Sequence, residues 1–307
     1  MNDLSVFYYS LATVALIIIL GFALGKFKAI SEHTNKQLVN ILLMVAMPCA
    51  LFSAFPQEFD ESSLSNLLYG LIGGVLVFLA LIILSKLLFN KKLFEKELSY
   101  ESQFAFVFNN ATFLGYPLVS TFFGPEALIP YCGFIIVFNL ALFSYGVFLF
   151  ERKVTAKLIR MTLLNPNIIA VLLGAVFFIF SLKLPDFLNS SIDYVGQVMT
   201  PLSLICIGYM LSRAKLKALW QKKKLFITAL LQLTLGPSIT FIILYFLGIP
   251  EEVRNILVLI QALPTATSLG LFAEKYGGNP TEASELVAIS TILSIITLPL
   301  AIMLFIL

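Results

Sequence analysis

Long apolar stretches alternate with short polar loops along the whole chain. A helix needs roughly 20 apolar residues to cross a bilayer, and ten stretches meet that length. They predict spans at residues 4–25, 36–55, 65–89, 100–123, 127–150, 165–182, 191–212, 224–247, 252–274 and 283–306. The fourth, seventh and ninth carry polar residues in mid-span. The pattern predicts an all-α polytopic membrane protein with ten transmembrane helices.

Composition supports this class and excludes others. Of the 307 residues, 59% are hydrophobic and 12% are charged, whereas a soluble protein has about 25% charged residues. The basic residues lie in short loops between spans, so nucleic acid is not an expected partner. Cys49, Cys132 and Cys206 lie inside apolar stretches and form no CxxC pair. The sequence therefore predicts no disulfide framework, no metal site and no cofactor.

Lysine and arginine are distributed unevenly over the two sides of the predicted spans. Eighteen of the 20 basic residues lie in or beside the loops that follow odd-numbered spans, and only Lys183 and Arg254 lie on the other side. Because basic residues accumulate in cytoplasmic loops, the side with 18 is predicted to be cytoplasmic. Both termini then lie outside the cytoplasm, and the lipid bilayer is that of the cell (plasma) membrane.

The two halves of the chain share a pattern. Pro48 and Pro201 lie 153 residues apart, each in the second span of its half. Five spans per half is an odd number, so the second half would be inserted upside down relative to the first. Many secondary transporters have such inverted repeats. The predicted repeats are residues 1–153 and 154–307.

Two spans are interrupted by residues that a transmembrane helix tolerates poorly. The segments are Phe108–Pro117 in the fourth span and Gln261–Ser268 in the ninth. Backbone freed from helical bonding finds no water in hydrocarbon, so it occurs only where it lines a cavity or is buried in protein. Interrupted spans at corresponding places in two halves point to a transporter's binding site. Simple proline kinks are the alternative.

The residues at these interruptions suit an anion. Helix N-termini beyond Pro117 and Pro264 would present unpaired N–H groups and the positive end of the helix dipole. Of the adjacent amides, we expect Asn110 rather than Asn109 to reach substrate, since neighbouring side chains point to different faces. Local backbone bonding is the alternative role for the hydroxyls. The predicted substrate-binding residues are Asn109, Asn110, Gly115, Tyr116, Pro117, Gln261, Pro264, Thr265, Thr267 and Ser268.

Ionisable groups are missing from the middle of the predicted spans. Glu101, Asp193 and Glu274 each fall near the end of a span, so no proton relay of the kind that such residues usually mark is visible. An intramembrane hydrolase would need a nucleophile–base pair or paired carboxylates in the membrane. Neither is present, so the sequence does not predict an enzyme.

The same residues carry a family resemblance. The stretch from Asn110 through Gly115-Tyr116-Pro117-Leu118 to Gly124 resembles the crossover segment of the auxin efflux carrier family, where an Asn precedes Met-Gly-x-Pro-Leu. Here Leu114 stands in place of the Met. The run from Gln261-Ala-Leu-Pro264 to Phe272-Ala-Glu-Lys-Tyr276 is similar to that family's Gln-Ala-x-Leu-Pro…Phe-Ala-x-x-Tyr run. The absence of a long hydrophilic central loop resembles the compact bacterial-type members.

This resemblance implies a fold like that of the bile acid–sodium symporters, with two five-helix inverted repeats and broken, crossed helices four and nine. It implies a scaffold of helices 1, 2, 6 and 7 and a mobile transport unit of helices 3–5 and 8–10. Pro48 and Pro201 would then lie on the scaffold face over which the site slides, with simple kinking as the alternative. The implied substrate is an organic anion.

The sequence therefore predicts a secondary transporter of small organic anions, working by elevator-type alternating access. Carboxylates such as malate or malonate are favoured over an auxin, because Thr265–Ser268 is more polar than its counterpart in the plant carriers. The alternative is a membrane sensor or interaction module that keeps the fold without flux. The coupling ion (sodium or proton), the direction of transport and a homodimer through the scaffold stay open.

The orientation is directly testable. A cysteine introduced in place of Asp3 or Leu307 should react with a membrane-impermeant thiol reagent in intact cells, because both termini are predicted to lie outside the cytoplasm. Protection of either cysteine in intact cells, with labelling only after lysis, would contradict the predicted orientation.

Overall fold

The computed structural model describes residues 3–55, 58–89, 96–151, 160, 163–213 and 222–306. Helices make up most of this part of the chain, and it contains no β-strand beyond one isolated bridge. The prediction of an all-α protein is confirmed. Part of the basic set used for the orientation lies outside the described residues, as does the predicted repeat boundary at 153/154. These basic residues are Lys91, Lys92, Arg152, Lys153, Lys157, Lys215 and Lys217.

Helices lie in all ten of the predicted ranges. Within the described residues, six helical stretches are long and apolar enough to cross a membrane: Glu32–Ser53, Glu61–Leu88, Pro125–Glu151, Asp186–Arg213, Lys223–Phe246 and Pro280–Phe305. Three shorter apolar helices accompany them: Ala12–Lys26, Ala111–Phe123 and Pro166–Ile179. The class of polytopic membrane protein is confirmed, and the arrangement as ten spans in two inverted repeats stays a prediction.

The chain forms two compact units. Unit 1 comprises residues 1–68, 112–132 and 163–214, and unit 2 comprises residues 69–111, 133–162 and 215–307. Each unit is thus assembled from three separate segments of the chain. The predicted scaffold helices fall in unit 1, and most of the predicted transport helices fall in unit 2.

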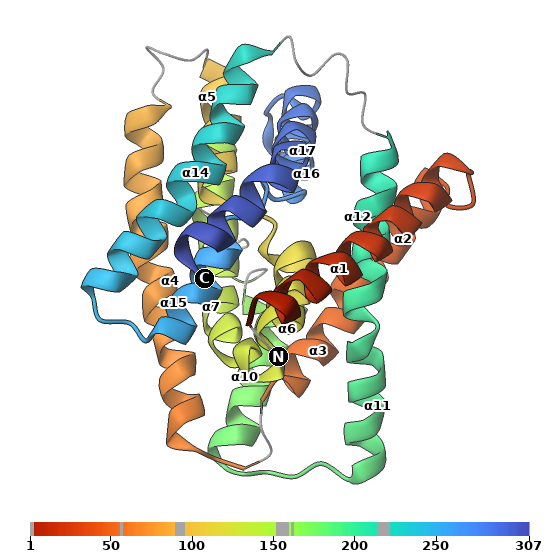
Figure 1. Cartoon of the computed structure of the whole chain (residues 1–307), viewed down its shortest axis with the longest axis vertical. Coiled ribbons are helices and arrows are strands. Elements are labelled where there is room, and N and C mark those ends of the chain that lie inside the picture. Colours follow the sequence, from red (N-terminus) through yellow and green to blue (C-terminus); the bar gives the residue numbers. More distant parts are fainter. Residues whose placement is uncertain are drawn as a thin grey trace. The chain divides into compact units, whose positions relative to one another are not determined.

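Unit 1 contains the helices from the start of the chain and from its middle (Figure 1). Their bounds are α1 Asp3–Lys26, α2 Glu32–Ile41, η1 Leu42–Ala46, α3 Met47–Ser53, η2 Ala111–Gly115, α6 Tyr116–Phe123, η3 Pro125–Ala127, α10 Pro166–Ile179, α11 Asp186–Gln197 and α12 Met199–Arg213. Here η2 starts at the last residue of a unit 2 segment. The most extensive packing in this unit is between α1 and α12.

Glycines bring the backbones of α1 and α12 into contact. A Cβ added to Gly21 would lie 2.2 Å from the carbonyl oxygen of Ile205, and one added to Gly208 would lie 2.0 Å from the carbonyl oxygen of Ile18. Small residues allow this approach, and in lipid such van der Waals packing drives helix association, because the tails are as apolar as the side chains.

Pro48 and Pro201 both lie beside a helix irregularity. Pro48 occupies the first turn of α3, directly after the π-helical turn η1. Pro201 lies near the start of α12, which is separated from α11 by Val198. Proline lacks an N–H and clashes with the preceding turn, so it is tolerated where the helical bonding is already irregular. This fits the kinking role, and the predicted scaffold-face role is not tested.

Residues 112–132 belong to unit 1, although the resemblance implies that helices four and five move with the transport unit. Their contacts explain the grouping. The helix α6 packs against α12 and α1. The ring of Tyr116 lies 5.9 Å from that of Tyr131 in an edge-to-face arrangement, and the Cys132 thiol donates to the carbonyl of Leu51 at 3.8 Å.

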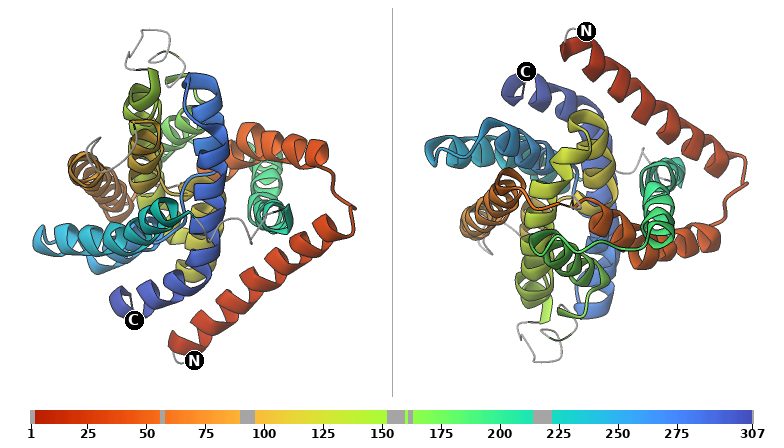
Figure 2. Two further views of the ribbon diagram at one scale, coloured as in Figure 1. Left: turned by 90° about the horizontal axis from the view of Figure 1, so that it is seen from above. Right: turned by 90° about the horizontal axis from the view of Figure 1, so that it is seen from below.

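Unit 2 contains the remaining helices, and Figure 2 shows its last one, α17, as one continuous helix that bends toward the C-terminus. Their bounds are α4 Glu61–Leu88, α5 Lys96–Val107, α7 Leu128–Ala141, η4 Leu142–Gly146, α8 Val147–Glu151, α14 Lys223–Phe246, α15 Glu251–Gln261, α16 Ser268–Tyr276 and α17 Pro280–Phe305. Both α4 and α7 begin in residues that count with unit 1. The helix α14 packs against α17, α15 and α5.

Phenylalanine rings fill the interior of unit 2. The ring of Phe78 on α4 lies 5.4 Å from Phe134 and 6.1 Å from Phe138 on α7, and 5.9 Å from Phe108 after α5. All four side chains are at most 3% exposed. Such aromatic pairs contribute about 0.5–1.5 kcal/mol each beyond the burial of their area. The interrupted helix α5 is therefore fixed by a packed aromatic core directly at its end.

The α1–α12 contact predicts the effect of adding one methyl group. Gly208→Ala should lower the free energy of unfolding by roughly 1–3 kcal/mol, because the new Cβ meets backbone atoms that cannot move aside. The measurement is thermal unfolding of the purified protein in detergent. The control is Met210→Ala on the same helix, where the side chain is 38% exposed. Equal melting temperatures for the two variants would contradict the close contact.

Candidate functional site

The first interruption lies between α5 and η2. The helix α5 ends at Val107 and helical structure resumes at Ala111, so the backbone is non-helical at residues 108–110. We expected the second half of this interrupted span to begin beyond Pro117, but its helical structure begins six residues before Pro117, at Ala111. Pro117 instead lies in the first turn of α6, directly after the π-helical turn η2. Proline has no N–H to donate, and here no regular helical bond is lost, because the bonding is already irregular in the wider π-helical turn.

The second interruption lies between α15 and α16. The helix α15 ends at Gln261 and α16 begins at Ser268, which leaves residues 262–267 outside both helices. The new helix begins four residues after Pro264, as predicted. From 262 to 266 every residue is buried. Non-helical backbone at membrane depth is therefore covered by protein, as the lack of water in hydrocarbon requires.

The two interrupted segments pair with one another inside unit 2. The Asn110 N–H donates to the carbonyl of Pro264 at 2.7 Å, and the Ala266 N–H donates to the carbonyl of Phe108 at 2.9 Å. Asn109 and Thr265 thereby form an isolated antiparallel bridge. This single rung satisfies four backbone groups that neither helix could satisfy. The position of each interruption is therefore fixed by the other.

Two side chains from neighbouring helices complete the backbone bonding. Gln232 of α14 donates its Nε2 to the carbonyl of Leu263 at 2.7 Å. The Thr265 N–H donates to Oγ of Ser290 on α17 at 3.1 Å. Gln232 is 1% exposed, and Thr265 and Ser290 are 0% exposed. The second interruption is thus held from three directions by elements of unit 2.

A side-chain bond also joins the two interruptions. Nδ2 of Asn109 donates to Oε1 of Gln261 at 2.7 Å, and both residues are 1% exposed. This bond engages Nδ2 of Asn109 and leaves its Oδ1, so the expectation that only one of the adjacent amides reaches substrate stays a prediction. Asn110 is 4% exposed.

Within the described part of the chain, four buried polar atoms around the rung have no hydrogen-bond partner. They are Oδ1 of Asn109, Oε1 of Gln232, Nε2 of Gln261 and Oγ1 of Thr265. Leaving such an atom unpaired costs about 1–3 kcal/mol, and most buried polar atoms in native structures are paired. For the Asn109–Gln261 pair the surplus does not depend on how the amides are turned, since one oxygen and one NH₂ group remain either way. The site therefore has capacity for a further polar partner.

The predicted site residues divide between the two units. Unit 2 holds Asn109, Asn110, Gln261, Pro264, Thr265, Thr267 and Ser268. Unit 1 holds Gly115, Tyr116 and Pro117 at the start of α6, where Gly115 is the N-cap. Thr267 is the N-cap residue of α16, and it makes no side-chain cap bond.

Two residues that bond the backbone of the second interruption, Gln232 and Ser290, were not predicted from the sequence. Gln232 is a lone amide within an apolar span, so its polarity could have marked it. Ser290 could not have been found, since a serine in a membrane helix usually bonds to its own backbone. Glu101 lies near the start of α5, at the end of a span as predicted; it is 0% exposed, and its Oε1 accepts the N–H of Asn279 at 2.7 Å. It anchors the turn before α17.

An all-α membrane protein with paired helix interruptions and neutral amides buried beside them is typical of membrane transporters. Comparison with known proteins identifies the family. The chain belongs to the auxin efflux carrier family, whose description is membrane transport protein and which matches residues 6–161 and 150–302. The resemblance drawn from the two motifs is thereby confirmed.

Named relatives are similar at low identity. An uncharacterized transporter of Methanocaldococcus jannaschii is 24% identical over 82% of this chain and 84% of its own. A Rhizobium meliloti protein whose name proposes malonate transport is 25% identical over 63% of each chain. Auxin efflux carrier component 8 of Arabidopsis thaliana is 26% identical over 42% of this chain and 36% of its own. The family and these names indicate a transporter rather than an enzyme.

The bond from Thr265 to Ser290 predicts a stability effect. Ser290→Ala should lower the free energy of unfolding by about 1–3 kcal/mol, because it leaves the Thr265 N–H buried without an acceptor. Thermal unfolding in detergent measures it. Ser294→Ala is the control, since this hydroxyl, also on α17, only donates to the carbonyl of Thr291 at 2.8 Å. Equal destabilisation by both variants would show that the Thr265 bond contributes nothing specific.

Proposed function

We propose that this protein is a secondary transporter of small organic anions, with carboxylates such as malate or malonate as substrates. The observation that carries the proposal is the pair of bonded helix interruptions with unpaired neutral polar atoms beside them in unit 2. Neutral donors and helix N-termini recognise an anion without placing a fixed positive charge in the membrane. Membership of a membrane transport family supports the same conclusion.

The chemistry of the unpaired atoms favours a substrate with both donors and acceptors. Nε2 of Gln261 is a donor that a carboxylate oxygen matches, whereas Oδ1 of Asn109 and Oε1 of Gln232 are acceptors. A 2-hydroxy dicarboxylate such as malate carries carboxylate oxygens and a hydroxyl donor, so it suits both kinds. Malonate offers acceptors alone. The relative whose name proposes malonate transport supports the dicarboxylate class.

The proposed mechanism is elevator-type alternating access. In it, predicted spans 3–5 and 8–10 carry the site past a scaffold of predicted spans 1, 2, 6 and 7. The grouping of most of these transport helices into unit 2, and of the scaffold helices into unit 1, supports it. Within unit 2 the interruptions are bonded to each other and to α14 and α17. A site held in this way can move as one body, which an elevator requires.

Flux into proteoliposomes tests the function. Labelled malate, malonate and a monocarboxylate are offered under imposed sodium, proton and voltage gradients, and empty liposomes are the control. We expect saturable uptake of the dicarboxylates, with malate preferred over malonate. The gradient that drives uptake identifies the coupling ion. Absence of flux for every anion, with a well-folded protein, would favour the sensor or interaction module instead.

Binding should depend on Asn110 more than on any ionisable residue. A hydrogen bond to a charged group contributes about 1.5–3 kcal/mol, so Asn110→Ala should weaken substrate binding by roughly ten- to a hundred-fold. Asn109→Ala should weaken it less, because Nδ2 of Asn109 is already bonded to Gln261 and only its Oδ1 is left for substrate. The measurement is substrate affinity of the purified variants, each checked for monodispersity.

Two carboxylate variants are the controls for this prediction. Asp193→Asn and Glu274→Gln should retain substrate binding, because both residues are predicted to lie near the membrane surfaces and Glu274 is exposed. Normal binding by Asn110→Ala, together with loss of binding in either carboxylate variant, would show that an acidic, ion-coupled site takes the place of the neutral one.

A further inference from the structure

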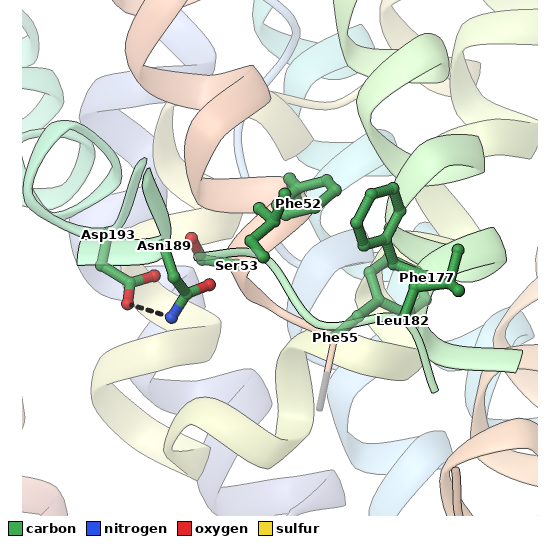
Figure 3. Close-up of a pocket in the computed structure, with 9 residues that line it drawn as sticks. Phe52, Ser53, Phe55, Phe177, Leu182, Asn189 and Asp193 are labelled. Atoms are coloured by element: carbon green, nitrogen blue, oxygen red, sulfur yellow. Dashed lines mark hydrogen bonds between the residues drawn. The ribbon is translucent and has the colours of Figure 1, made fainter. Parts of the chain in front are cut away.

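A cavity lies in unit 1, and its lining residues belong to neither interruption. Its volume is about 250 Å³, and it is formed by the end of α3, by α10, by α11 and by the segment between α10 and α11. The lining residues are Phe52, Ser53, Phe55, Gly174, Phe177, Leu182, Leu184, Asn189 and Asp193 (Figure 3). No predicted substrate-binding residue is among them.

Six of the nine lining residues are apolar, and three of these six are aromatic. The rings of Phe52 and Phe177 stand 5.4 Å apart at an angle of 71°, and Phe55, Leu182 and Leu184 complete this part. A dry cavity of about 150 Å³ is sufficient to hold benzene, whereas drug-sized ligands need about 300–1,000 Å³. The cavity therefore fits a molecule of one ring with a short side arm.

The remaining wall is polar and rich in acceptors. Nδ2 of Asn189 donates to Oδ2 of Asp193 at 3.3 Å, and Oγ of Ser53 is buried without a hydrogen-bond partner. Figure 3 shows these three side chains on one side of the view and the rings of Phe52 and Phe177 on the other. A carboxylate can accept about four hydrogen bonds, so the long bond from Asn189 leaves Asp193 able to accept more.

Among the residues that the structure describes, no basic side chain lines this cavity. Lys183 lies between two lining leucines in the sequence, but its Nζ is 3.1 Å from Oε1 of Glu58, and both side chains are largely exposed. The cavity thus combines one carboxylate, one hydroxyl and aromatic faces. A carboxylate and aromatic rings attract an ammonium group, since the ring faces carry negative potential. An anionic ligand would meet Asp193 with the same sign of charge.

We propose that this cavity binds a small aromatic ammonium compound, with its ring against the side chains of Phe52, Phe55 and Phe177 and the ammonium group at Asp193 and Ser53. The ligand is opposite in charge to the proposed transport substrate. This second site belongs to unit 1 alone, and it does not depend on which anion the protein transports.

The test is binding of 2-phenylethylamine to the purified full-length protein, measured by isothermal titration calorimetry. Two ligands of similar shape accompany it: 3-phenylpropionate, which is negatively charged, and 2-phenylethanol, which is neutral. We expect the amine to bind at least tenfold more tightly than either. Equal binding of all three would show an apolar void without a charge-selective site and would overturn the proposal.

Variants locate the site. Asp193→Asn should weaken amine binding at least tenfold, and Ser53→Ala should weaken it less. Asp186→Asn is the matched control, because Asp186 is an exposed carboxylate on the same helix that does not line the cavity. Equal affinity in Asp193→Asn and Asp186→Asn would overturn the proposal. If Asp193→Asn does not fold, Phe177→Leu removes a ring, and unchanged amine affinity in that variant is equally contrary.

The result is independent of the transport test. Asp193→Asn should lose the amine while keeping the organic anion, and Asn110→Ala should do the reverse. Failure of amine binding with normal anion flux would remove only the second site. Failure of flux with normal amine binding would remove only the proposed function.

Discussion

The bonding of backbone groups where no water is present is the constraint on which the site depends. Two membrane helices stop, and the groups they release must find partners within protein. They find them in each other, through the rung between Asn110 and Pro264 and between Ala266 and Phe108. Because the rung joins segments about 150 residues apart, neither helix can be interrupted without the other.

This arrangement places polar but uncharged side chains in the membrane. An ionised side chain in mid-bilayer is costly and needs a partner, whereas an amide needs only hydrogen bonds. Asn109, Gln232 and Gln261 meet part of that need with each other and with the backbone, and keep one unpaired atom each. In the proposed function the substrate would be held by hydrogen bonds to these neutral groups, without a buried ion pair.

The sequence predicted the helices and the two interruptions, because hydropathy and polar residues in mid-span are local signals. It did not predict where helical structure resumes after the first interruption, because the residue types do not reveal the π-helical turn at Ala111–Gly115 that precedes Pro117. The role of Ser290 and the cavity at Asp193 were also not predicted. Both depend on tertiary packing, which brings together side chains from elements distant in the chain, and no single element carries their signature.

The unpaired atoms must be held in place by packing elsewhere in unit 2. Four of them surround the rung, and at about 1–3 kcal/mol each they oppose the folded arrangement substantially. Lipid provides no hydrophobic force between helices, so close contact must offset this cost. The rings around Phe78 and Phe108 supply such contact directly beside the first interruption. A ligand that paired the four atoms would remove part of the cost, so the same atoms that destabilise the empty site are the ones that favour its occupation.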